Sequence, residues 1–491
     1  MSKLFVFGIG GTGSRVLKSL TMLLMAGVKT NVDEIIPIVI DKDNTNGDMV
    51  ETKRLIETYI YTQKKFAHDS GKFFSTRMSL LGNGNLCLQL KDDAQKFSDY
   101  MGMDQLDESN RALVEALFSK QALDMKTTEG FRGIPSIGSV VLNQFEQSDF
   151  FTDFADQFKN GDRIFIISSI FGGTGASGFP LLVKTLRNPT KLSNWDYVSK
   201  APIGAISVLP YFIVRKAEEP GKVKVDSDTF ISKAKAALDY YAQTLDGKIN
   251  DMYYVGDEKF SIFPYHAGGE KQRNLAHFVE LVSALSIIDF ANNGKDDNNS
   301  RTCYHEFGII TPQNKSDRII FDDLHVETKK IIANPLIQLY TFRQYMQYVF
   351  DKENEYQPWS HNFPNKEKNN FDSIFKQSEA MQHLLECLNG FNTWLTDLAD
   401  NESHKHSFIP FNLTTDSFAF LYGKDDKCMI KSSKGRYSGW AWFDNELNKA
   451  CTKKETQVSE TMTKEQRFLE IFYRATKNFV DNLIPNSQDN N

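Results

Sequence analysis

The chain has 491 residues, of which 41% are hydrophobic and 24% are charged, and its formal net charge is −6. This composition is ordinary for a soluble globular protein, and the length suffices for one large core or for two domains. The negative charge argues against a surface that coats nucleic acid, since such surfaces are usually basic.

Cysteines and targeting signals narrow the class of protein further. The five cysteines are scattered and contain no Cys-x-x-Cys pair, so we expect neither a zinc site nor a disulfide framework. The N-terminus runs into a strand pattern without the features of a signal peptide, and no apolar run reaches the roughly 18 residues of a membrane span. These features predict a cytoplasmic protein with no membrane span and no strong nucleic-acid signal.

The first 300 residues alternate between strand and helix patterns. Strands are predicted at 2–8, 35–40, 163–170, 203–209 and 252–255, and helices at 14–27, 138–158, 179–187, 229–245 and 272–292. Alternation of this kind indicates parallel βαβ units. The predicted fold class is therefore α/β, with a Rossmann-like parallel sheet.

The remainder of the chain is richer in helix patterns. Helices are predicted at 327–350, 371–400 and 459–484, and strands around 418–422 and 440–443. The polar run 292–300 is a natural boundary, and 351–370, rich in Lys, Glu, Asn and Pro, is typical of a linker or long loop.

Two glycine-rich loops follow predicted strands. Residues 8–14 read Gly-Ile-Gly-Gly-Thr-Gly-Ser, and residues 171–178 read Phe-Gly-Gly-Thr-Gly-Ala-Ser-Gly. Glycine lets the backbone approach a phosphate, and the start of a helix adds free N–H donors and the positive end of a dipole. Ligands of parallel sheets bind beyond the carboxyl ends of the strands, where both loops fall. The pair therefore predicts one polyphosphate held from two sides.

These loops carry a resemblance to a known family. Residues 172–178 resemble the signature loop of the tubulin and FtsZ superfamily, Gly-Gly-Gly-Thr-Gly-Ser/Thr-Gly, with Phe171 at the first glycine. Residues 133–138, Gly-Ile-Pro-Ser-Ile-Gly, are similar to the family loop that faces the terminal phosphate, and 204–212 to the strand before the ribose loop. The chain resembles a divergent bacterial tubulin-like protein as far as about residue 290.

The resemblance implies a domain organisation. It places a nucleotide-binding domain at 1–268, a long central helix at 269–293, an α+β activation-type domain at 294–458 with a helical insertion at about 327–405, and a C-terminal helix and tail at 459–491.

The resemblance also implies that GTP or GDP binds with Mg²⁺. The implied phosphate-binding residues are Gly10, Gly11, Thr12, Gly13 and Ser14, then Gly133, Pro135 and Ser136, then Gly172, Gly173, Thr174, Gly175, Ala176 and Ser177. No lysine occupies a Walker A position, so positive charge is expected from Mg²⁺, from helix ends or from Arg132. The alternative for Arg132 is a solvated loop residue.

Four further residues complete the implied nucleotide site. Asp41 and Asn44 resemble the loop after the second strand of FtsZ, which lies near nucleotide and metal; the alternatives are helix capping or an Asx turn. Asn274, at the predicted start of the central helix, is our choice to read guanine, because its amide both donates and accepts. Phe278 either stacks on the base or packs in the core.

Hydrolysis in this superfamily needs a neighbouring subunit, whose acidic residue positions the attacking water. The candidates are Asp296 and Asp297 after the central helix, or Asp322 and Asp323 further along. The resemblance thus implies a GTPase that assembles head to tail into an oligomer or filament. If all four are surface acids, the chain is instead a nucleotide-gated scaffold or switch, whose C-terminal region contacts other proteins.

Two other enzyme classes share the N-terminal loop. A dinucleotide-binding enzyme would use Asp41, at the end of the second strand, to bind a ribose hydroxyl. An adenylating enzyme of the ubiquitin-activating type is similar in Gly-x-Gly-Gly-x-Gly-Ser and in the Asp-x-Asp of residues 41–43. Neither class explains the loop at 172–178, which favours the tubulin-like reading.

Overall fold

The computed structural model describes most of the chain. The described residues are 2–43, 45–67, 72–82, 84–88, 96–127, 131, 133–189, 192–214, 229–257, 261–263, 269–294, 301–308, 318–348, 350, 358–361, 371–400, 406–411, 413, 440–451 and 462–483.

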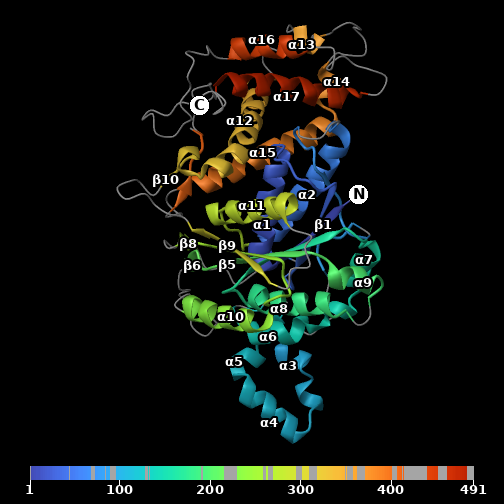
Figure 1. Cartoon of the computed structure of the whole chain (residues 1–491), viewed down its shortest axis with the longest axis vertical. Helices are drawn as coiled ribbons and strands as arrows, with labels where there is room; N and C mark the ends of the chain where they lie inside the picture. Colours follow the sequence, from blue (N-terminus) through green and yellow to red (C-terminus); the bar gives the residue numbers. More distant parts are fainter. Residues whose placement is uncertain are drawn as a thin grey trace.

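A seven-stranded parallel sheet lies at the centre of the molecule (Figure 1). Its strands, in spatial order, are β3 (Arg77–Met78), β2 (Glu34–Ile40), β1 (Lys3–Ile9), β4 (Arg163–Ser169), β5 (Ile203–Val208), β7 (Asp251–Gly256) and β9 (Cys303–Gly308). The central strands are almost wholly buried, as their apolar runs require. The predicted α/β class with a Rossmann-like sheet is confirmed. Strands β1 to β3 follow one another toward one edge of the sheet, and β4, β5, β7 and β9 follow one another toward the other edge, so the strand order switches between β1 and β4.

Helices cover both faces of this sheet (Figure 1). One face carries α1 (Gly10–Met25), α2 (Gly47–Phe66) and α11 (Phe278–Asn293). The other carries α6 (Pro135–Val141), the 3₁₀ turn η3 (Leu142–Gln147), α7 (Asp149–Gln157), α8 (Gly173–Arg187), α9 (Trp195–Lys200) and α10 (Phe230–Thr244). Beyond α6 extend α3 (Phe97–Tyr100), η1 (Met103–Gln105), α4 (Glu108–Leu117) and α5 (Lys120–Leu123).

A second helical layer packs over α1 and α2. It contains α12 (Val326–Tyr348), α13 (Pro358–His361), α14 (Ser373–Lys376), α15 (Glu379–Ala399), α16 (Trp440–Cys451) and α17 (Lys464–Leu483). Two small parallel sheets pair β6 (Phe212–Val214) with β8 (Ser261–Phe263), and β10 (Arg318–Ile319), followed by η5 (Phe321–Asp323), with β11 (Ser407–Phe408). Within the described residues no helix is both long and apolar enough to span a membrane.

The central helix is shorter than predicted. We expected it at 269–293, with a helix pattern from residue 272, but α11 begins at Phe278. The side chain of His277 accepts from the N–H of Val279 at 3.1 Å, and Glu280 accepts from the His277 N–H at 3.0 Å, so these two residues form a capping box. Residues 269–274 instead hydrogen-bond to the loop after β2.

Two other predictions from the second half need correction. Residues 440–443, predicted as a strand, begin the helix α16, because their aromatic residues also fit helical spacing. The segment 303–308 falls in the predicted activation-type domain, but as β9 it is the edge strand of the main sheet. The strand predicted at 418–422 lies outside the described residues, and the remaining domain boundaries stay predictions.

Candidate phosphate-binding site

The three loops singled out in the sequence meet at the carboxyl edge of the sheet. A Cβ atom on Gly10 would lie 3.4 Å from the Cβ of Thr174, and one on Gly173 would lie 3.0 Å from the backbone nitrogen of Gly133. Gly10 and Gly133 have φ angles of +72° and +75°, which favour glycine. We call residues 10–14, 133–136 and 172–177 the phosphate cradle.

Each of the three loops leads into a helix whose first turn is uncapped. The helices α1, α6 and α8 have no side-chain hydrogen bond at the N-cap and no acidic residue in the first turn. By contrast, α2, α4, α7 and α15 are capped by Asn46, Asp107, Ser148 and Ser378. The first N–H groups of a helix lack partners within it, and they carry the positive end of its dipole. The cradle therefore presents N–H donors and partial positive charge to an anion.

The predicted hydroxyl groups are not equally available to a ligand. Thr174 is partly exposed and Thr12 is 7% exposed. Ser14 and Ser177 are fully buried, and their hydroxyls donate to carbonyls one turn back in their own helices, at 3.5 Å and 2.7 Å. In this structure both hydroxyls are thus engaged within their own helices, and their contact with phosphate stays a prediction; their backbone is part of the cradle.

The glycines of the cradle divide into two groups. A Cβ on Gly13 would lie 2.4 Å from the backbone of β1, and one on Gly175 would lie 2.6 Å from the carbonyl oxygen of Ser169, so these glycines allow α1 and α8 to pack on their strands. A Cβ on Gly11 would meet only the tip of Arg15, at 3.4 Å. Gly11 therefore has room for a Cβ atom, with the Arg15 guanidinium as its one close neighbour. The other cradle positions that are at least partly exposed are Gly133, Ile134, Pro135, Ser136, Gly172, Thr174 and Ala176.

A buried network of charges lies directly behind the first loop. Arg15, one turn along α1 from Thr12, donates to Glu280 of α11 at 2.6 Å and to Asp48 of α2 at 2.9 Å. It also donates to the Tyr211 hydroxyl at 3.0 Å and to the Thr12 hydroxyl at 3.4 Å, and Tyr211 in turn donates to Glu280 at 2.7 Å. Burial raises the pKa of Asp48, and the positive charge of Arg15 opposes that shift. This network ties the cradle to the central helix.

The residues predicted to hold the base lie on either side of this network. The N–H of Asn274 donates to Asp48 at 2.9 Å, so Asn274 lies one side chain away from Arg15, although it precedes the helix. Phe278 is 5% exposed, and its ring centroid lies 5.2 Å from that of Phe408. Phe278 therefore packs in the core, which is one of the two roles that the sequence left open for it.

Asp41 is buried at the carboxyl end of β2. Its side chain is 7% exposed and accepts from the N–H of Asp43 at 3.2 Å. Burial raises the pKa of Asp41 to about 7. Asp43, by contrast, is engaged with the backbone of Gly269 and with Thr45, which gives it a structural role in the loop. Asn44 lies outside the described residues.

The sequence reasoning missed one cation at the cradle. Lys233 of α10 donates to the carbonyl of Gly133 at 2.9 Å, which brings an ammonium group to the cradle loop 133–136. Its position on a helix from another βα unit gave no signal in the linear sequence. Arg132, the predicted cation, lies outside the described residues.

The four candidate catalytic acids lie after α11. Asp296 and Asp297 fall outside the described residues. Asp322 is exposed and forms an ion pair with Lys329, and Asp323 accepts from the N–H of Ile320 at 3.0 Å. Asp323 therefore caps its own turn, and the structure leaves the choice among the four acids open.

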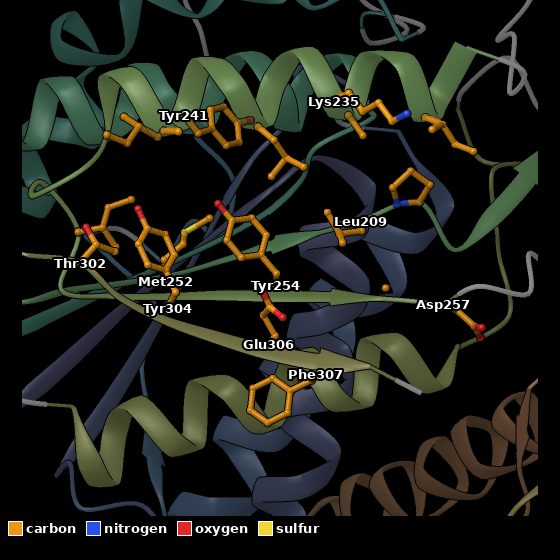
Figure 2. A pocket seen from close by; sticks show the side chains of 18 residues that line it. Leu209, Lys235, Tyr241, Met252, Tyr254, Asp257, Thr302, Tyr304, Glu306 and Phe307 are labelled. Carbon is orange, nitrogen blue, oxygen red and sulfur yellow. The ribbon is translucent and has the colours of Figure 1, made fainter. Parts of the chain in front are cut away.

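A cavity of about 790 Å³ lies between α10 and the β7–β9 part of the sheet (Figure 2). It adjoins the cradle through Tyr241, whose hydroxyl donates to the carbonyl of Ala176 at 3.3 Å. Its lining is mainly apolar and aromatic, including Tyr241, Tyr254 and Tyr304. Among the predicted nucleotide-binding residues that the structure describes, none lines this cavity. The rings of Tyr254 and Tyr304 point toward α10, whereas that of Phe307 lies on the opposite side of the strands.

Comparison with known proteins gives distant structural likenesses only. No protein-family model and no curated protein matches the chain. Among solved structures it is similar to CetZ from Methanosaeta thermophila, with a TM-score of 0.28 and 14% identity over 61% of this chain and 57% of that one. It is also similar to a mutant FtsZ from M. jannaschii, with a TM-score of 0.24 and 13% identity over 52% of this chain and 46% of that one. A third similar structure is CetZ2 from Haloferax volcanii, a protofilament with GTPγS bound, with a TM-score of 0.27 and 12% identity over 59% of each chain. The chain therefore matches only about half to three fifths of these proteins' length.

Proposed function

We propose that the chain binds guanosine triphosphate together with Mg²⁺, with the phosphates in the cradle. The observation that carries this proposal is the meeting of three uncapped helix starts, those of α1, α6 and α8. A triphosphate is the anion that three separate sets of N–H donors fit, because its charge is spread over several groups. Lys233 adds positive charge, and Mg²⁺ is held chiefly by phosphate oxygens and water.

The preference for guanine rests on the family resemblance of the loops. Asn274 is the residue proposed to bind the base, because its amide can donate and accept and because the loop 269–274 is held beside Asp48 and Arg15. A rival ligand is a dinucleotide, which the strand order of the sheet and the buried Asp41 at the end of β2 both favour.

We propose further that the chain assembles head to tail and hydrolyses GTP between subunits. The acid that positions water would come from the neighbour, from Asp296, Asp297, Asp322 or Asp323. A head-to-tail contact repeats without closing unless its rotation makes a ring, so filaments are the expected product. If hydrolysis is slow, the same binding site serves a nucleotide-gated scaffold.

The cradle is tested best through Gly11. Substitution of Gly175, by tryptophan or even by alanine, would force α8 away from β4, so it cannot separate binding from folding. At Gly11 a Cβ atom would meet only Nη1 of Arg15, at 3.4 Å, so alanine fits there, and Gly11→Glu adds a negative charge to the first loop of the cradle. Equilibrium titration should show that G11E abolishes GTP binding while G11A retains most of it.

Leu113→Glu is the matched charge control, because Leu113 is 57% exposed on α4, far from the cradle (Figure 1). The L113E variant should bind like the wild type. If G11E binds GTP as tightly as G11A, the phosphates do not occupy the cradle.

Assembly is tested by sedimentation and electron microscopy with GTP, with GDP and without nucleotide. Filaments that need GTP would support the proposal, whereas a chain that stays monomeric at high concentration with GTP bound would refute assembly. Mixed chains sharpen the test: D297N and D323N each lack a candidate acid, and G11E lacks the nucleotide site. The variant without the catalytic acid and the G11E variant should each be inactive alone. One orientation of a mixed contact joins an intact site to an intact acid and should restore hydrolysis.

A further inference from the structure

A second group of ligand-type side chains lies at the opposite edge of the sheet from the cradle. In the register of β7 and β9, Asp251 pairs with Cys303 and Tyr253 with His305. Alternate side chains of a strand share one face, and cross-strand partners share it too. All four therefore lie on the face covered by α11, at the amino ends of their strands, whereas the cradle lies at the carboxyl ends.

We propose that Asp251, Cys303 and His305 form a binding site for a transition-metal ion, with Zn²⁺ as the best-fitting ion. One ligand atom from each residue lies within 4.8 Å of the other two, and His305 Nε2 is 2.9 Å from Asp251 Oδ1. Ligand atoms around tetrahedral zinc are separated by roughly 3.3 to 3.8 Å, given its usual bond lengths. Small side-chain rotations therefore suffice to close the site around an ion.

The donor set selects the class of metal. A thiolate and an imidazole favour Zn²⁺ and its neighbours, whereas Mg²⁺ and Ca²⁺ prefer sites made of oxygen alone. Once the thiol has released its proton to solvent, the thiolate and the Asp251 carboxylate together balance the charge of a divalent ion. Three protein ligands also leave a fourth position for water or an external group.

The surroundings support the ligands and leave room at that fourth position. The His305 ring stacks on Tyr253 at 4.3 Å, with 12° between the planes, which fixes the orientation of the imidazole. Tyr253 donates to Asp289 of α11 at 2.7 Å, and Asn293 donates to the same carboxylate at 2.9 Å. A cavity of about 680 Å³ adjoins the three ligands, and Asp289, Asn293 and Arg301 also line it. Outer-shell contacts of this kind orient ligands in known metal sites.

The proposed site runs against our expectation that the cysteines offer no zinc site. That expectation relied on the absence of Cys-x-x-Cys, a pattern local in sequence. Here the strand register brings together residues as far as 54 positions apart, and the only local sign is the alternation of Cys303 and His305 along one strand.

The test uses the full-length chain, stripped with a chelator and kept in a reductant that contains no thiol. Titration with Co²⁺ should saturate at one ion per chain and produce a near-ultraviolet thiolate-to-cobalt charge-transfer band, which one equivalent of Zn²⁺ should remove. The thermal unfolding midpoint should also rise with Zn²⁺, because the ion joins the edge strand β9 to β7 and binds the folded chain alone.

Substitutions assign the ligands. C303S should lose the charge-transfer band, and C303S, H305Q and D251N should each weaken Zn²⁺ binding by more than the roughly 10- to 100-fold that follows loss of an outer-shell partner. C87S is the control, because Cys87 is a partly buried thiol outside the site, and it should bind Zn²⁺ like the wild type.

Circular dichroism of each stripped variant checks that the fold is intact. If one variant fails to fold, the cobalt spectrum of the wild type and the other two variants still decide the question. A wild-type chain that binds neither Co²⁺ nor Zn²⁺ in stoichiometric amounts would overturn the proposal, as would a folded C303S that binds Zn²⁺ as tightly as the wild type. Either result would be independent of GTP binding, which involves the other edge of the sheet.

Discussion

Replacing Arg15 with leucine should destabilise the fold strongly. Arg15 is the cation of the buried network, and its guanidinium donates to Glu280, Asp48, Tyr211 and Thr12. Glu280 is fully buried and Asp48 is 5% exposed, so neither carboxylate can gain water in place of the lost partner. Removing one member of a buried ion pair typically costs about 3 to 5 kcal/mol, because a charge is left buried and unpaired. We expect a loss of that size in the free energy of unfolding.

The measurement is urea-induced unfolding of the wild type and the R15L variant, followed by circular dichroism at pH 8 and at pH 5. The loss should be smaller at pH 5, because carboxylates buried without a cation take up protons more readily. Adding E280Q to R15L should restore part of the stability, since it removes one of the unpaired charges.

A surface ion pair provides the control for this prediction. The side chain of Arg54 is 74% exposed and pairs with Glu386 of α15, so R54L should cost about 1 kcal/mol or less. If R15L costs no more than R54L, or if its loss of stability does not depend on pH, the buried network does not stabilise the fold.

Three further predictions concern the site and its turnover. Because burial raises the pKa of Asp41 to about 7, this residue loses its proton at lower pH in the unfolded chain than in the folded one, and the free energy of unfolding should fall by up to about 4 kcal/mol between about pH 4 and pH 7. Unfolding curves of D41N should show a weaker dependence of stability on pH, and an unchanged dependence would refute this prediction. K233M should weaken GTP binding roughly tenfold in equilibrium titrations, since it removes a charge-assisted contact at the cradle, and unaltered affinity would place Lys233 outside the site. D297N should slow GTP hydrolysis by roughly 100-fold or more without loss of nucleotide affinity, and D323N should slow it less, because Asp323 already caps its own turn. Steady-state assays over a range of protein concentrations measure this, and wild-type turnover in them should rise faster than linearly with concentration. A larger loss of turnover in D323N than in D297N would contradict the prediction.

The order of elements in the first half of the chain follows from local patterns. Apolar runs such as 163–170, followed by glycines and a helix pattern, are enough to predict βα units. Because the carboxyl ends of parallel strands share one edge of the sheet, the glycine loops that follow these strands are then predicted to meet. The close approach of Gly10 to Thr174 agrees with the prediction that the two glycine loops lie side by side.

Features set by distant contacts could not be predicted in this way. Arg15 and Glu280 are 265 positions apart, and each alone resembles an ordinary charged residue on a helix. The start of α11 was misplaced because the cap at His277 competes with a helix pattern that begins several residues earlier. The edge strand β9 follows the central helix, where the family resemblance ends, so only its pairing with β7 identifies it.

Isothermal titration of the full-length wild-type chain with GTP, ATP and NAD, each with and without Mg²⁺, is the decisive measurement for guanine-nucleotide binding. We predict one binding site per chain that takes GTP more tightly than ATP, gains affinity with Mg²⁺ and does not bind NAD. Tight binding of NAD with no response to either triphosphate would contradict the account, and would make the chain a dinucleotide-binding protein.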